Sequence, residues 1–285
     1  MSSFFPDNLP YFLSDSTSVM YKTHWNYIKY LNTSFLGINI KIKIKVSSYL
    51  DPEKTKRFEK LASITKQNIE SEIHACEQET SYSSVVAPWI PVKCYYRIYY
   101  LESIFLYYLL GSEAGFKNGG HTKVRGSIRK IIEEGVINFE GLNPDIFSEI
   151  DNWENASSFT TTSGSNISGN YFQHPDCRHS IRKKIAEYIK IDWMQKKGII
   201  NFRKKVNKDL RDIELKPKKF TIFDYFYWMR IKANYRDVDF LDFENEVSAR
   251  DSFEYIKEFV GATESYASAL ENAIITLKQS RSITN

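Results

Sequence analysis

The chain has 285 residues, of which 42% are hydrophobic and 15% aromatic. A chain of this length buries roughly three quarters of its unfolded surface, and its 26% of charged residues is an ordinary share, so global disorder is excluded. The net charge is only +4, and the three cysteines, Cys76, Cys94 and Cys177, are too far apart in sequence for a Cys-x-x-Cys zinc or redox site.

The first predicted element is a strand. Residues 1–34 have a mixed, aromatic composition and are assigned no element. From Leu36 to Val46 apolar and polar residues alternate, which predicts a half-buried strand whose inner face carries Ile38, Ile40, Ile42, Ile44 and Val46. A helix is predicted next, over 51–79, with Pro52 in its first turn.

The helices that follow are predicted from apolar periodicity and capping residues. Residues 92–110 are apolar nearly all round, which is typical of a central core helix, and the aromatic stripe from Tyr95 to Tyr108 is assigned to core packing. After a glycine-containing loop, His121 opens a helix that ends at Gly135. Further helices are predicted over 180–197, 221–235 (with Thr221 as N-cap) and 249–278.

The predicted fold class is mainly α, a helical bundle with a small N-terminal β element. Residues 1–85 form a strand-plus-helix region, and residues 86–285 form a helical domain. Within this domain a segment near 156–170 is rich in Ser, Thr and Gly and is expected to be a flexible loop. A basic insertion is placed near 177–219.

Charge is unevenly distributed along the chain. Residues 177–219 contain fifteen Lys or Arg and five Asp or Glu, whereas residues 237–271 contain ten acidic and two basic residues. This asymmetry permits a polyanionic partner on the basic face; the alternative is that two solvated helix faces attract each other. Candidate contacts to a nucleic-acid backbone are Arg203, Lys204, Lys205 and Lys208.

Several classes of site have no supporting motif. The sequence has no glycine-rich phosphate loop, dinucleotide fingerprint, Gly-x-Ser-x-Gly or kinase signature. No two of its five histidines lie three or four residues apart, so neither a metal nor another cofactor is expected. The most apolar stretch, 95–110, is shorter than the roughly 20 residues that a bilayer requires. We therefore expect a cytoplasmic protein without a membrane partner.

Two segments together resemble the HEPN superfamily, the higher-eukaryote and prokaryote nucleotide-binding domains. In the first, the aromatic helix 95–111 and a glycine-rich loop precede the His-led helix 121–135. In the second, the long acidic helix follows Trp228-Met229-Arg230-Ile231-Lys232-Ala233-Asn234-Tyr235-Arg236-Asp237. The order and spacing of these segments carry the resemblance.

The resemblance implies a HEPN-like helical bundle that dimerises and binds RNA. Many members of the family are metal-independent ribonucleases, in which an Arg followed after four to six residues by His meets its counterpart in a second copy. RNA cleavage needs a base for the 2′-hydroxyl and a cation for the phosphate. The matching residue here is Arg230, which would clamp the phosphate with Asn234 and Tyr235 beside it. No His follows Arg230, a departure that argues against the family's usual nuclease chemistry and leaves RNA binding intact.

The leading hypothesis is an RNA-binding protein or metal-independent endoribonuclease of a bacterial toxin or antiviral defence system. Its expected partners are RNA or DNA, a second copy of the chain, and an antitoxin or defence-system protein. One alternative is a non-catalytic dimerisation and scaffold module. Another is the DNA-binding subunit of a restriction-like system, which would use the basic segment alone.

The candidate residues also have structural interpretations. Arg230 is alternatively an ion-pair partner of an acidic neighbour, such as Asp224 or a residue of the last helix. Tyr235 is alternatively a buried anchor, and His121 a helix cap or surface residue. A dimer interface is expected along the helix 221–235, because its aromatic cluster exceeds what one core-facing stripe can use. The members of this cluster are Phe223, Tyr225, Phe226, Tyr227 and Trp228.

Overall fold

The computed structural model describes residues 17–44, 50–117, 120–142, 147–148, 174–201, 204–215, 220–221, 223–235 and 247–282. Its helices and helical turns are α1 (Thr17–Ser34), α2 (Glu53–Gln78), η1 (Thr80–Tyr82), α3 (Ser83–Val86), α4 (Ile90–Leu110), η2 (Ala114–Phe116), α5 (Gly120–Glu133), α6 (His174–Lys197), η6 (Lys205–Asn207), α7 (Lys208–Leu210), η7 (Arg211–Leu215), α8 (Asp224–Tyr235) and α10 (Ala249–Ser282). Its strands are β1 (Asn39–Ile42), β2 (Ile137–Glu140), β3 (Phe147–Ser148) and β4 (Phe220–Thr221).

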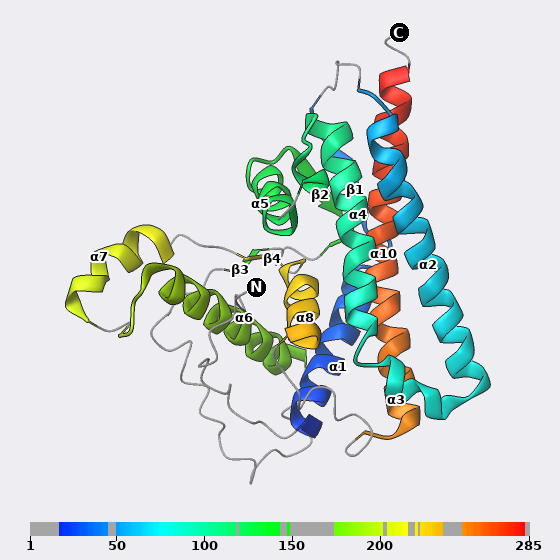
Figure 1. Ribbon diagram of the computed structural model, residues 1–285, viewed down its shortest axis with the longest axis horizontal. Helices are drawn as coiled ribbons and strands as arrows, with labels where there is room; N and C mark the ends of the chain where they lie inside the picture. Colours follow the sequence, from blue (N-terminus) through cyan, green and yellow to red (C-terminus); the bar gives the residue numbers. More distant parts are fainter. Residues whose placement is uncertain are drawn as a thin grey trace, which may run out of the picture.

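The fold is mainly α with a small antiparallel β element, as the sequence predicts (Figure 1). The predicted long helices correspond to α2, α4, α5, α6 and α10, with ends that differ by a few residues. The prediction lacks helix α1 and the strands β2, β3 and β4; β3 pairs with β4 in a second two-stranded antiparallel sheet. The loop expected near 156–170 lies outside the described residues.

Helix α4 is the centre of the bundle. It packs against α2 and α10, and α8 packs on it as well (Figure 1). Sixteen of its 21 residues are buried, because apolar residues surround the whole helix. It ends at Gly111, whose φ of 68° is left-handed and favours glycine. The core prediction for the stripe from Tyr95 to Tyr108 is confirmed, except that Tyr96 and Tyr100 stay partly exposed.

Polar contacts within the core fix α4 against α10. Arg97 is 4% exposed; its Nη2 donates to Glu271 at 3.1 Å, and its guanidinium also pairs with Glu264. Further along α4, the buried Glu102 accepts a hydrogen bond from the Tyr266 hydroxyl at 3.0 Å. A shifted register would leave these buried polar groups unpaired, so they help to specify one alignment of the two helices.

The small sheet is shorter than the alternating sequence predicts. β1 pairs with β2 over four residues. Of the predicted inner face, Ile40 is buried but Ile44 is 39% exposed, so the strand predicted over 36–46 is too long. The paired part of β1 is short because its partner, β2, is short. Beyond the hydrogen bond from Lys43 N to Val136 O, at 2.9 Å, no described segment pairs with this strand.

One cluster of buried side chains joins the N-terminal elements to the rest of the bundle. Tyr27 and Ile28 of α1 and Ala62 of α2 belong to the same cluster as Leu270 of α10. Helix α1 packs against α10, and α2 packs against α4. The described parts of regions 1–85 and 86–285 therefore share a hydrophobic core.

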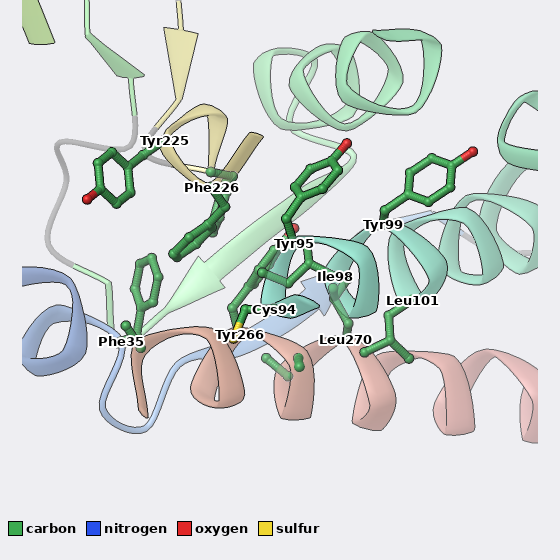
Figure 2. Packing of buried hydrophobic residues seen from close by; sticks show 14 of the residues in the cluster. Phe35, Cys94, Tyr95, Ile98, Tyr99, Leu101, Tyr225, Phe226, Tyr266 and Leu270 are labelled. Carbon is green, nitrogen blue, oxygen red and sulfur yellow. The ribbon is translucent and has the colours of Figure 1, made fainter. Parts of the chain in front are cut away.

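Helix α8 uses its aromatic residues within the chain. Four members of the aromatic cluster are buried in the core: Phe223, Tyr225, Phe226 and Trp228. Phe223 stacks on Tyr266 of α10 with ring centroids 4.2 Å apart, and Figure 2 shows Tyr225 and Phe226 on the side of the core where Phe35 lies. These four rings pack within the chain against α1 and α10, so they are not available as the motive for a dimer interface, and the interface expected along 221–235 stays a prediction.

Helix α6 packs against α1 and leads to an arm that ends in α7 (Figure 1). Ile181, Ile185, Ile189 and Trp193 repeat every four residues, which predicts an apolar side for this helix. Ile181, Ile185 and Trp193 are each no more than 3% exposed, and Ile189 is partly buried, so the prediction is confirmed. Helix α6 and this arm together carry the described part of the basic insertion.

Candidate arginine–histidine site

Helix α5 presents three nitrogen-bearing side chains on one face. His121, Arg125 and Arg129 follow one another at four-residue intervals, so they lie one turn apart along the helix. The side chains of Arg125 and Arg129 are 18% and 28% exposed. We use the name Arg–His cluster for His121 and Arg125 of α5, Arg230 of α8, and Tyr95 and Tyr96 of α4.

The close approach of α5 to α4 depends on glycine. A Cβ at Gly120 would lie 2.5 Å from Tyr99 Oη and 2.8 Å from the carbonyl oxygen of Ala114. A Cβ at Gly115 would overlap the side chain of Ser103. The Gly115 carbonyl also accepts a hydrogen bond from Tyr99 Oη at 2.6 Å. The first turn of α5 can therefore contact α4 only because both positions lack a side chain.

Gly120→Ala is expected to lower the free energy of unfolding by about 1–3 kcal/mol, because the new methyl group forces a shift of Tyr99 or of the loop backbone. Gly126 supplies a matched control in the same helix, since it is exposed and a Cβ there would have no atom within 4 Å. Gly126→Ala is expected to raise the same quantity by about 1 kcal/mol through helix propensity. Urea unfolding measures both, and equal effects would contradict the close approach at Gly120.

His121 is half-buried among tyrosines of α4. Its Nδ1 lies 2.9 Å from Tyr95 Oη, and its ring centroid lies 4.0 Å from that of Tyr99. Both tyrosines project from α4 on the side away from α10 (Figure 2). Burial, followed by the charges of Arg230 and Arg125, lowers the pKa of His121 to about 4, so its imidazole is neutral at pH 7. Burial also raises the pKa of Tyr95, so either neutral group can donate the hydrogen bond.

Arg230 reaches the same tyrosines from α8. Its Nη2 donates to Tyr96 Oη at 3.1 Å. Its guanidinium carbon lies between 5.3 and 5.9 Å from the ring centroids of Tyr95, Tyr96 and Tyr227. These distances are those of cation–π contacts, and the charge of Arg230 is one of the causes that lower the pKa of His121.

Asp224 holds the arginines of α5. It is 4% exposed and pairs with Arg125, while Arg129 Nη2 lies 3.1 Å from each of its carboxylate oxygens. The backbone N–H of Thr221 also donates to it, at 2.6 Å. Helix α8 begins at Asp224, and Thr221, which the sequence predicts as its N-cap, lies in β4 and donates to the Asp224 carboxylate in the first turn of the helix. The arginines that pair with Asp224 are Arg125 and Arg129, not Arg230, which was its alternative partner in the sequence interpretation.

Two residues predicted beside Arg230 lie in the last turn of its helix. Asn234 and Tyr235 end α8, and their side chains lie outside the described part of the structure. The described polar partner of Arg230 comes instead from α4, through Tyr96. The buried-anchor interpretation of Tyr235 therefore stays a prediction.

The predicted backbone contacts lie away from the Arg–His cluster. Lys204, Lys205 and Lys208 are exposed and belong to the arm that ends in α7, which Figure 1 places well apart from α5 and α8. Arg203 lies outside the described residues. The basic arm and Arg230 are thus separate places on the molecule.

Sequence reasoning missed that α5 places His121 on the tyrosines that Arg230 also contacts, and that its arginines pair with Asp224 of α8. The four-residue spacing of His121, Arg125 and Arg129 is a readable signal for one helix face. This spacing does not indicate that the face lies near Arg230 and Asp224, because those residues are about a hundred positions later in the chain.

Neither a metal-binding group in the described residues nor a similar known protein indicates which chemistry the Arg–His cluster performs. Within the described ranges, no helix combines the length and apolar character that crossing a membrane requires. In the same part of the chain, no three His, Cys, Asp or Glu side chains are grouped so that they could hold a metal ion. No family model, no curated protein and no solved structure matches this chain. Its function is therefore argued from the geometry and charge of the site.

Proposed function

We propose that the protein is a HEPN-like RNA-binding protein that cleaves RNA without a metal ion at the Arg–His cluster, in a bacterial toxin or antiviral defence setting. The observation that carries the proposal is the neutral imidazole of His121 beside the guanidinium of Arg230. A base and a phosphate-binding cation are the two groups that RNA cleavage requires. Helix α5 supplies the imidazole that the sequence after Arg230 lacks.

Both groups belong to one chain, so the proposed site does not need a second copy. The homodimer implied by the family resemblance remains part of the proposal, with an interface other than the buried rings of α8. Lys204, Lys205 and Lys208, together with Arg203, are proposed as a second contact to the nucleic-acid backbone. Such contacts are independent of base sequence and weaken as salt rises.

The proposed reaction is attack of an RNA 2′-hydroxyl on the adjacent phosphorus. When Nδ1 of His121 is protonated and donates to Tyr95 Oη, Nε2 carries the lone pair that accepts the 2′-hydroxyl proton. The bond from O2′ to phosphorus forms while the bond from phosphorus to the 5′-oxygen breaks. The products are a 2′,3′-cyclic phosphate and a 5′-hydroxyl whose proton comes from water. Arg230 holds the phosphate oxygens, whose charge grows in the transition state.

Binding of the phosphate makes His121 a stronger base. With a pKa of about 4, the imidazole of the empty protein accepts a proton only weakly. Part of this lowering comes from Arg230 and Arg125. A phosphodiester beside these guanidinium groups neutralises part of their charge, so the pKa of His121 rises towards its ordinary value when RNA is bound.

Purified protein in EDTA is expected to cleave a single-stranded RNA oligonucleotide to fragments that end in a 2′,3′-cyclic phosphate. The same sequence in DNA should bind but remain intact, because it lacks the attacking hydroxyl. Mass spectrometry of the fragments identifies the ends. Cleavage of the DNA, or loss of cleavage in EDTA, would contradict the proposed chemistry. Binding of RNA without cleavage would favour the non-catalytic module, and preferential binding of duplex DNA would favour the DNA-binding alternative.

A further inference from the structure

The central helix α4 leaves one stripe of residues outside the core. Sixteen of its 21 residues are buried, and the remaining ones are Val92, Lys93, Tyr96, Tyr100 and Leu110. Tyr96 and Tyr100 are four residues apart, so they lie one turn apart on the same face. Other tyrosines of this helix, such as Tyr95 and Tyr99, are buried. The packing of the bundle therefore leaves two neighbouring tyrosines of its central helix partly exposed.

Tyr96 belongs to the Arg–His cluster, and Tyr100 extends the row of rings from it. Tyr96 accepts a hydrogen bond from Arg230 at 3.1 Å, and its ring centroid lies 5.6 Å from that of His121. The ring centroids of Tyr96 and Tyr100 are 6.1 Å apart, with their planes inclined by 32°. Tyr100 in turn meets the ring of Phe58 from α2 edge-on, at 5.2 Å. The result is a row of rings that begins at the proposed phosphate clamp and leads towards α2.

Positive charge lies at both ends of this row. Arg230 is at one end, with its guanidinium carbon 5.3 Å from the Tyr96 centroid. At the other end, Arg57 of α2 is exposed and close enough to Tyr100 to act electrostatically on its hydroxyl. The lysine of the stripe, Lys93, is already paired with Glu72. Two cations flanking partly exposed aromatic faces complement a strand that alternates phosphates with flat bases.

We propose that Tyr96 and Tyr100, flanked by Arg57 and Arg230, bind unpaired bases next to the Arg–His cluster, so that the substrate is single-stranded RNA. This inference rests on the proposed function and names the substrate class of the same site. Bases in a duplex are paired and stacked on each other, whereas unpaired bases can stack on protein tyrosines. Unpaired bases of a single strand therefore stack on Tyr96 and Tyr100, while Arg230 holds the adjacent phosphate.

The test compares labelled single-stranded RNA with an RNA hairpin of the same composition by fluorescence anisotropy. The wild-type chain is expected to bind the single strand at least about tenfold more tightly than the hairpin. Tyr100→Leu should weaken single-strand binding about tenfold, because it removes the stacking ring and keeps an apolar side chain. It should leave hairpin binding unchanged. Tyr82→Leu is the matched control, since Tyr82 is an exposed tyrosine of η1 outside the stripe.

A second variant separates stacking from folding. Tyr100→Phe keeps the ring, so it is expected to bind single strands like the wild type even if Tyr100→Leu unfolds. Equal binding of single strands and hairpins, or loss of binding in Tyr100→Phe that retains the wild-type thermal unfolding midpoint, would overturn the inference. If the protein cleaves RNA but binds single strands and hairpins equally well, the proposed function is supported and only this inference is contradicted. Absence of binding to either RNA would remove both.

Discussion

Replacement of Arg230 by alanine is expected to slow RNA cleavage by about 100- to 1000-fold, because the guanidinium stabilises charge that develops on the phosphate in the transition state. Arg230 is half-buried and contacts the tyrosines of α4 mainly through its charged group. Its removal should therefore leave the thermal unfolding midpoint nearly unchanged. Arg250→Ala is the matched control, since Arg250 is an exposed arginine in the first turn of α10.

The same substitution has a second readout that does not depend on activity. The charge of Arg230 helps to lower the pKa of His121 to about 4, so Arg230→Ala should raise that pKa, as seen in an NMR titration of the histidine ring signals. The Arg250→Ala control should leave the pKa of His121 unchanged. Equal cleavage rates for wild type and Arg230→Ala would assign the activity to another site or to a contaminant. A His121 pKa that does not move would contradict the proximity of the two groups.

Replacement of Glu102 by glutamine is expected to raise the free energy of unfolding at pH 8 by about 3 kcal/mol. Burial raises the pKa of Glu102 to about 7, although the Tyr266 hydroxyl and the Arg125 charge oppose this increase. At pH 8 the folded protein must therefore hold a buried carboxylate. Glutamine keeps an oxygen that accepts from Tyr266 Oη and carries no charge, so the cost of that carboxylate disappears.

The pH dependence of stability separates Glu102 from His121. Between its unfolded pKa of about 4.5 and its folded pKa of about 7, Glu102 keeps a proton that the unfolded chain has released, so its contribution to stability falls as pH rises. His121 acts in the opposite direction. Its pKa is about 6.5 unfolded and about 4 folded, so between these values the unfolded chain binds the extra proton and stability rises with pH.

The two slopes oppose each other in the wild-type protein, and Glu102→Gln removes one of them. Urea unfolding of this variant from pH 4 to pH 8 should therefore give a stability that rises with pH, with little difference from wild type near pH 4. Glu70→Gln, at an exposed position of α2, is the control and should follow the wild-type curve. A Glu102→Gln profile parallel to that of the wild type would show that Glu102 is already ionised in the folded protein at low pH.

The pattern within single helices predicted much of the bundle. The apolar surface all round 92–110 indicated a buried central helix, and α4 is one. The repeat of Ile181, Ile185, Ile189 and Trp193 indicated the inward side of α6, on which Ile189 alone stays partly exposed. Both predictions succeed because the residues on one face of a helix are spaced three and four positions apart in the sequence, so the positions of apolar residues show which face is buried.

Helix α1 is an element that such patterns did not predict. Its sequence is rich in Thr, Ser, Asn and aromatic residues, which have modest helix propensity. Tyr27, Ile28 and Leu31 are nevertheless buried, and the helix packs against α10. Contacts with distant segments, rather than the intrinsic preference of the chain, stabilise it as a helix.

For the candidate site too, properties of a single helix were predictable from the sequence, whereas contacts between helices were not. The sequence predicts that Arg230 lies in a helix over 221–235 and that His121 opens the helix 121–135, because each of these is a property of a single element. The packing of the helices brings His121 and Arg230 to the same tyrosines of α4 and places four rings at α8 in the core. The physical reason is that such meetings depend on how α4, α5 and α8 pack. Here that packing rests on a glycine at position 120, where a Cβ would lie 2.5 Å from Tyr99 Oη, and on the pairing of Asp224 with Arg125.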